Sequence, residues 1–182
     1  MGTAGSPRDV HHLVDAYYAA LYRYAYRLSG SPLHAEDLTQ EAFCKAQANL
    51  GQLRDPARVR PWLFSILRTS YLHWLRSQKQ HPCLSLDGVG DVAGPGPDEP
   101  PDIDPERLQQ ALNELPEEFR TPIILFYFSD FSYRDIAEQM DLPLGTVMSR
   151  LSRAKGFLRA RLTPPAPVGA AAARPGRTAH GL

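Results

Sequence analysis

The chain has 182 residues, of which 43% are hydrophobic and 22% are charged. These proportions are typical of globular proteins and exclude a fibrous or wholly disordered chain. Its 20 basic side chains are balanced by 20 acidic ones, so the molecule as a whole is not an electrostatic binder of nucleic acid, and any basic surface must be local.

Two segments, residues 10–80 and 105–162, are rich in helix formers and have apolar residues every three or four positions. They predict an all-α protein made of two small helical domains. Between them, residues 81–104 contain five prolines, four glycines and six acidic residues, which is the composition of a flexible, acidic linker. Residues 163–182 have few large apolar side chains, and we expect them to form a disordered tail.

The first domain is expected to begin with a helix over residues 10–28 and, after Gly30, a second over residues 32–50. In the first helix one stripe is apolar, formed by Leu13, Tyr17, Leu21, Tyr24 and Leu28. In the second, Leu38, Ala42, Ala46 and Leu50 share the apolar face. The opposite face gathers Asp37, Gln40, Glu41 and Cys44.

A third helix is expected over residues 61–79, with its apolar side formed by Leu63, Leu67, Tyr71, Trp74 and Leu75. Its other face carries Ser65, Arg68, Thr69, His73 and Arg76, with Trp62 at the start. Residues 54–80 have a net charge of +5, whereas residues 98–118 have a net charge of −7 and are expected to compete for the basic surfaces.

The second domain ends in a predicted helix-turn-helix. Ser132 and Asp135 resemble a capping box and start a short helix. Pro143 ends that helix, Gly145 permits a sharp reorientation, and a second helix opens at Thr146. Residues 146–161 contain five basic residues and no acid. A helical hairpin with a solvated basic face is the alternative interpretation of this segment, but paired arginines favour DNA, because arginine binds guanine bidentately.

The motifs LPEEFR, SYRDIAE, PLGTVMSRL and RAKGFLR follow one another between residues 112 and 162. Together they resemble sigma region 4 of the extracytoplasmic-function sigma factors, while AEDLTQEAFCKA and RPWLFSILR in the first domain resemble sigma region 2. The resemblance implies an alternative sigma factor that binds core RNA polymerase and directs promoter-specific transcription initiation. It implies neither an enzymatic activity nor a cofactor.

The resemblance also assigns roles to residues. Docking on the beta-prime clamp helices of the polymerase falls to Asp37, Leu38, Gln40 and Glu41. Binding of the minus-10 strand falls to Arg60, Trp62, Ser65, Arg68, Thr69, His73 and Arg76. Recognition of the minus-35 element falls to Thr146, Met148, Ser149, Arg150, Ser152 and Arg153. The beta flap of the polymerase is a further expected partner, and regulation by an anti-sigma factor is compatible with the family.

Two other classes of protein fit the sequence less well. A conventional helix-turn-helix regulator would need a dimerising or ligand-sensing domain, which residues 11–80 do not resemble. An enzyme would need a histidine beside a nucleophile and a carboxylate, or a glycine-rich phosphate loop, and neither motif is present. Cys44 and Cys83 lack metal-ligand spacing and are expected to be reduced thiols. No apolar run of 18 residues and no signal segment occurs, so we expect a cytoplasmic location without a membrane span.

Overall fold

The computed structural model describes residues 10–80 and 104–163, and every regular element in these two ranges is a helix. The first domain consists of α1 (Val10–Ser29), α2 (Pro32–Ala48), the single 3₁₀ turns η1 (Leu50–Gln52) and η2 (Pro56–Arg58), and α3 (Val59–Gln80). The second consists of α4 (Pro105–Glu114), α5 (Glu117–Phe128), α6 (Tyr133–Met140) and α7 (Leu144–Leu162). The predicted all-α fold with two helical domains is confirmed. The expected linker and tail lie outside the described residues, except for their boundary residues 104 and 163.

Local chemistry explains the helix boundaries of the first domain. Gly30 adopts φ 71°, which ends α1, and Ser31 then caps α2 by accepting a hydrogen bond from the backbone N–H of His34. α2 is two residues shorter than predicted, because the Asn49 side chain donates a 2.8 Å hydrogen bond back to the Lys45 carbonyl and the chain tightens into η1. The predicted stripe of α1 is buried except for Tyr17, which is half-buried.

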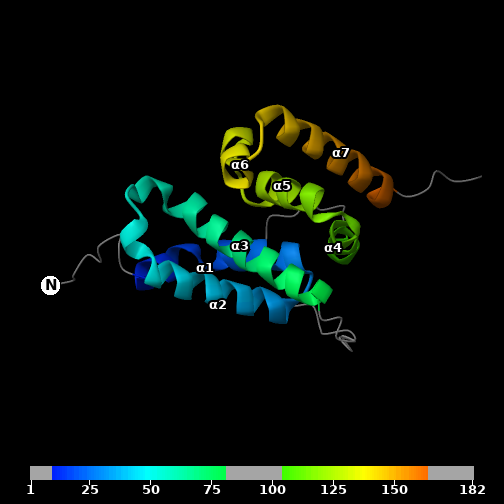
Figure 1. Ribbon diagram of the computed structural model, residues 1–182. Coiled ribbons are helices and arrows are strands. Elements are labelled where there is room, and N and C mark those ends of the chain that lie inside the picture. The colour runs from blue at the N-terminus through cyan, green and yellow to red at the C-terminus, as the bar shows by residue number, and fades with distance from the viewer. Residues whose placement is uncertain (1–9, 81–103, 164–182) are drawn as a thin grey trace, which may run out of the picture.

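In the second domain, α5 lies in the middle. It packs on α7 on one side and on α1 of the first domain on the other, so it separates α7 from the first domain (Figure 1). Ile123, Ile124 and Leu125 of α5 are each no more than 1% exposed, which explains why this helix is apolar on more than one face.

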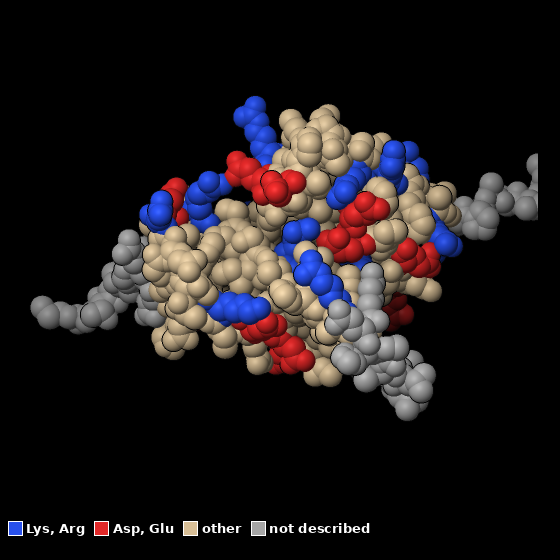
Figure 2. Space-filling model, viewed as in Figure 1, with Lys and Arg blue, Asp and Glu red and all other residues tan. Residues whose placement is uncertain are grey.

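The two domains pack against each other, an arrangement that the sequence did not predict. α1 contacts α4 and α5, and α3 contacts α6. One continuous cluster of buried apolar residues includes members of both domains. Basic and acidic side chains lie next to one another around the junction between the two layers (Figure 2). The described residues therefore form a single two-layer body.

Candidate nucleic-acid interface

The predicted helix-turn-helix is formed by α6 and α7. The Ser132 hydroxyl accepts a hydrogen bond of 3.2 Å from the backbone N–H of Asp135, whose carboxylate accepts one of 3.0 Å from the backbone N–H of Ser132. This reciprocal capping box confirms the predicted start of the helix. Ile136 and Met140 are buried beneath it, so α6 is anchored to the core of the domain.

The turn between these helices reverses at a different residue from the one predicted. Asp141 adopts the left-handed conformation (φ 53°), and the N–H groups of Asp141 and Leu142 bond to carbonyls in the last turn of α6. Aspartate tolerates this conformation better than most residues, because its short polar side chain forms local hydrogen bonds. The prediction for Gly145 was wrong: it lies inside α7, which begins at Leu144 rather than at Thr146, with Pro143 as its N-cap.

α7 presents to solvent four of the six residues assigned to the minus-35 element: Met148, Ser149, Ser152 and Arg153. Thr146 and Arg150 are half-buried. An Nη atom of Arg150 lies 3.3 Å from a carboxylate oxygen of Glu118 in α5, whereas Arg153 makes no ion pair within the described ranges. Arg153 is therefore available to DNA in this structure, and Arg150 is held by its neighbour.

The seven residues assigned to the minus-10 strand do not share one face of α3. Five lie along its outer face: Trp62, Ser65, Thr69, His73 and Arg76. Arg60 and Arg68 instead face the second domain, where Arg60 donates to the Ser129 carbonyl and Arg68 pairs with Glu117 at 3.6 Å. The predicted placement of Arg68 beside Ser65 was therefore wrong, because packing of α5 against α3 draws its side chain away from solvent.

A cleft of about 280 Å³ lies beside the outer face of α3. Besides Trp62, Ser65, Ile66 and Thr69, its lining includes three residues that the sequence did not single out, namely Lys45, Asn49 and Gln52. Only the packing of α2 and η1 against α3 brings them here. Lys45 donates a 2.9 Å hydrogen bond to the Ser70 hydroxyl, which orients it. One signal was available in the sequence, since Lys45 is the only lysine or arginine of α2.

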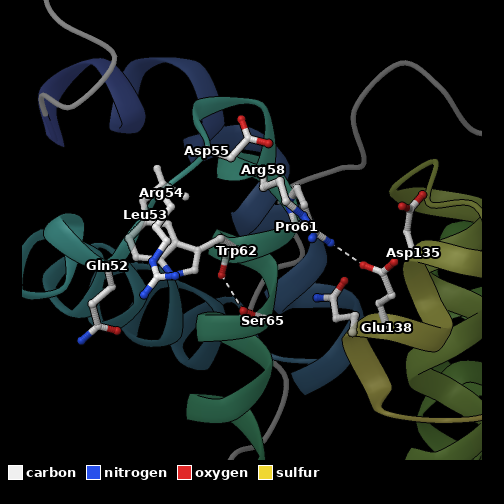
Figure 3. A pocket seen from close by; sticks show the side chains of 11 residues that line it. Gln52, Leu53, Arg54, Asp55, Arg58, Pro61, Trp62, Ser65, Asp135 and Glu138 are labelled. Carbon is white, nitrogen blue, oxygen red and sulfur yellow. Dashed lines mark hydrogen bonds and ion pairs between the residues drawn. The ribbon is translucent and has the colours of Figure 1, made fainter.

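A second cleft, of about 380 Å³, opens where the first domain meets α6 (Figure 3). Trp62 and Ser65 lie on one side of it, and Asp135 and Glu138 lie on the other. Arg58 reaches across to form an ion pair with Glu138. Trp62 and Ser65 thus line both clefts.

The polar face of α2 is exposed as predicted for Asp37, Gln40 and Glu41. Glu41 pairs with Lys45 one turn later at 2.6 Å. Leu38 differs from these three, because its side chain is 3% exposed and belongs to the core. The structure therefore places Leu38 beneath the predicted polymerase-docking face rather than on it.

Two kinds of site are not formed by the residues that the structure describes. Within residues 10–80 and 104–163, no group of three His, Cys, Asp or Glu side chains is placed to hold a metal ion. In the same ranges, no helix combines the length and the apolar character that a bilayer-spanning segment requires.

The helices that build these surfaces match known families. A family model of Sigma-70 region 2 matches residues 13–81, and one of Sigma-70 region 4 matches residues 106–158. The chain is also 30% identical over 162 residues to the ECF RNA polymerase sigma factor SigW of Bacillus subtilis, a match that covers 82% of this chain and 87% of SigW. This chain belongs to the extracytoplasmic-function (ECF) sigma factors.

Other members of the family are similarly close. The ECF sigma factor SigL of Mycobacterium tuberculosis is 33% identical over 156 residues, which cover 82% of this chain and 86% of SigL. The crystal structure of the sigma factor RpoE from Bartonella quintana, in complex with the anti-sigma factor NepR, matches with a TM-score of 0.72 and 30% identity. That match covers 85% of this chain and 97% of RpoE, so it spans both domains.

In this ECF sigma factor, α1–α3 form region 2 and α4–α7 form region 4. Like its family, it binds core RNA polymerase and promoter DNA and directs promoter-specific transcription initiation, and it is not an enzyme. The conventional helix-turn-helix regulator is not favoured, because region 2 stands where a dimerising or ligand-sensing domain would be expected.

Proposed function

We propose that this ECF sigma factor recognises its promoters with two separate surfaces, the first half of α7 for the minus-35 element and the outer face of α3 for the melted minus-10 strand. The observation that carries the proposal is the exposed polar side of α7, which lies opposite a buried seam formed by Val147, Leu151 and Ala154. A helix anchored in this way enters the major groove and presents its N-terminal residues to base edges.

On α7, the side-chain chemistry suits base recognition. Arg153 is exposed and long enough to reach guanine O6 and N7 from the groove. Ser149 and Ser152 supply hydroxyls that bond either bases or phosphates. Met148, which is 52% exposed, offers an apolar contact to a thymine methyl group. Arg150 can contact a base once its ion pair with Glu118 breaks. While the pair is formed, it holds α7 against α5.

On α3, the chemistry suits unpaired bases. Trp62 provides an aromatic surface for stacking between two clefts. The amides of Asn49 and Gln52, together with the Thr69 hydroxyl, supply donors and acceptors for base edges at the smaller cleft. Arg76, exposed further along the helix, supplies a cation for the sugar–phosphate backbone.

The remaining partners follow from the same arrangement. We assign docking on the beta-prime clamp helices to Asp37, Gln40 and Glu41, and contact with the beta flap to region 4. An anti-sigma factor is a further proposed partner, because the similar RpoE is held by one. Since core polymerase and the chromosome are its partners, we place the protein in the cytoplasm.

Run-off transcription tests this proposal. Core polymerase is incubated with genomic promoter templates, with and without the protein, and the transcripts are mapped. We expect new start sites that share a minus-10 and a minus-35 element, and we expect Arg153→Ala to weaken them more than Arg159→Ala, an exposed arginine nearer the end of α7. Tight, selective binding of promoter duplex by the protein alone, without any polymerase-dependent transcript, would contradict it.

A further inference from the structure

The smaller cleft beside the outer face of α3 is formed by region 2 alone. Its volume is about 280 Å³, and all the residues that line it come from α2, η1, α3 and the Asn49 junction. Sites for drug-sized ligands usually measure roughly 300–1,000 Å³, so this cleft suits one planar group rather than a longer segment. Trp62 and Ile66 supply its apolar lining. The polar groups around these two side chains decide which base it prefers.

Two hydroxyl groups of α3 present lone pairs, and not hydrogens, to the cleft. Ser65 donates its hydroxyl hydrogen to the Trp62 carbonyl at 2.7 Å (Figure 3), and Thr69 donates its own to the Ser65 carbonyl at 2.9 Å. A hydroxyl has one hydrogen and two lone pairs, so both oxygens remain as acceptors. Ser65 and Thr69 are four residues apart in one helix, so the two acceptors are neighbours on its surface.

A chain of amide hydrogen bonds fixes a third acceptor. The Asn49 amide nitrogen donates a 2.8 Å hydrogen bond to the Lys45 backbone carbonyl, which determines the orientation of the Asn49 side chain, because a carbonyl only accepts. The Asn49 side-chain oxygen accepts a 2.9 Å hydrogen bond from the Gln52 amide nitrogen. This leaves the oxygen of the exposed Gln52 side chain as an acceptor at the cleft.

Lys45 is a cationic donor beside these acceptors. Its ammonium group donates a 2.9 Å hydrogen bond to the Ser70 hydroxyl and pairs with Glu41 at 2.6 Å. An ammonium group has three hydrogens, so one remains for a ligand. The two existing contacts hold the long side chain in place, which lowers the entropy that binding would otherwise cost. The cleft therefore combines three acceptors with a fixed cationic donor, and the remaining amide hydrogens of Asn49 and Gln52 are neutral donors.

The four bases differ in how well they complement this set. The exocyclic amino group of adenine or cytosine has two hydrogens, one for each hydroxyl oxygen, and the ring nitrogen next to it accepts from the Lys45 ammonium. Thymine has a single N–H on this edge and would bring a carbonyl oxygen to one of the hydroxyl oxygens. Guanine has a carbonyl oxygen where adenine has its amino group. Both bases would therefore leave acceptors facing acceptors, which costs binding free energy.

We propose that this cleft selects adenine or cytosine from the melted minus-10 strand, and that the Ser65 and Thr69 hydroxyls determine the choice by accepting from the exocyclic amino group. The inference rests on the proposed function of α3 and adds to it the chemical class of the base. Trp62 and Ile66 bind any base, because stacking and apolar contact do not depend on the base edge. Discrimination against thymine and guanine comes from the polar groups.

The test uses the holoenzyme and a forked promoter DNA in which the minus-10 strand is unpaired. Each minus-10 position carries the four bases in turn, and dissociation constants are measured at one salt concentration. At the selective position, purine replaces adenine, or 2-pyrimidinone replaces cytosine, so that only the exocyclic amino group is lost. Thr69→Val and Ser65→Ala remove the two acceptors. The matched control is Ser77→Ala, because Ser77 donates to the Trp74 carbonyl in the same way at 2.7 Å but does not line the cleft.

We expect wild-type holoenzyme to bind the adenine or the cytosine form on the order of tenfold more tightly than the thymine and guanine forms. Loss of the amino group should weaken binding by a similar factor in the wild type and in Ser77→Ala. It should have little effect in Thr69→Val or Ser65→Ala, because an acceptor for the amino group is already missing. The analogue that loses affinity identifies the base. Thr69 is exposed, and thermal unfolding shows that the variants remain folded.

The outcomes separate this inference from the proposed function. Selection of thymine or guanine at the position that responds to Thr69→Val, absence of any base preference, or an undiminished effect of amino-group removal in Thr69→Val and Ser65→Ala would overturn the inference. An equal response in Ser77→Ala would do the same. Trp62→Ala tests the proposed function itself, since loss of stacking should weaken binding of forked DNA whatever the base. Unchanged binding by Trp62→Ala would contradict the minus-10 role of α3, whereas weakened binding without base preference would contradict only the selection of adenine or cytosine.

Discussion

The Arg120 guanidinium in region 4 donates a hydrogen bond to the Tyr71 hydroxyl in region 2, 49 residues earlier in the chain. Its carbon also lies 5.9 Å from the centre of the Tyr71 ring, which is 1% exposed. A core residue of one region is thus the hydrogen-bond acceptor for a cation of the other.

Tyr71→Phe removes this acceptor and leaves the half-buried Arg120 without it. We expect the free energy of unfolding to fall by about 1–3 kcal/mol, the usual effect of leaving a buried polar group unpaired. Urea denaturation measures the change. Tyr127→Phe, at a tyrosine that is 52% exposed, is the matched control and should stay within about 0.5 kcal/mol of the wild type. Equal effects of the two substitutions would contradict the importance of the contact.

Tyr24→Phe should have the opposite effect on stability from Tyr71→Phe. The Tyr24 hydroxyl is buried without a hydrogen-bond partner among the described residues, so removing it relieves a desolvation penalty and leaves no other group unpaired. We expect an unchanged or higher midpoint of thermal unfolding. A clear loss of stability would show that the hydroxyl is bonded in solution.

Alkaline pH should destabilise the protein. Burial raises the pKa of Tyr24 and Tyr71 above the ordinary value near 10, against the opposing effects of Arg68 and Arg120 respectively. The folded chain holds both phenols protonated, so stability is complete below about pH 10 and falls as the pH rises above it, by up to about 1.4 kcal/mol per pH unit for each tyrosine. Urea unfolding at increasing pH measures the slope. The free energy of unfolding should fall less steeply with pH in Tyr24→Phe than in the wild type. An identical slope would show that Tyr24 does not contribute to the alkaline loss of stability.

Substituting Asp37 and Glu41 with lysine should abolish binding to core polymerase. Both residues are exposed on α2, so helicity should persist, although Glu41→Lys exchanges an ion pair with Lys45 for a repulsion of a few tenths of a kcal/mol. Co-purification with core measures binding. Asp15→Lys/Glu106→Lys makes the same charge change at exposed positions elsewhere and should bind normally. Undiminished binding by the Asp37/Glu41 variant would remove this face of α2 from the docking site.

Arg153→Ala should weaken holoenzyme binding to the cognate promoter by about 1–3 kcal/mol and relax the preference at one minus-35 base pair. Arg150→Ala should show a smaller loss of base preference and some loss of stability, because Arg150 is paired with Glu118. Binding titrations with single-base promoter variants separate these effects. A uniform loss across all sequences would identify a phosphate contact, and no loss from either substitution would exclude α7 as the recognition helix.

The helix-turn-helix could be predicted from the sequence because its determinants are local. The capping box joins Ser132 to Asp135 three residues later, and the seam of α7 repeats at helical spacing, so neither depends on distant parts of the chain. The stripes of α1 and α3 were predicted for the same reason. Even there, the reversal at Asp141 was missed, because glycine is the commoner residue at a left-handed position.

The sequence by itself determined the helices, the two regions and the family, since periodicity, capping and motif order are properties of neighbouring residues. Only the tertiary structure decided which face of α3 is open, that Leu38 lies in the core and that Lys45, Asn49 and Gln52 join Trp62 at a cleft. It alone also paired Arg27 with Gln109 across 82 residues. Such contacts depend on how completed helices pack against each other, and a side chain halfway round a helix, like Arg68, takes its environment from the partner that arrives there.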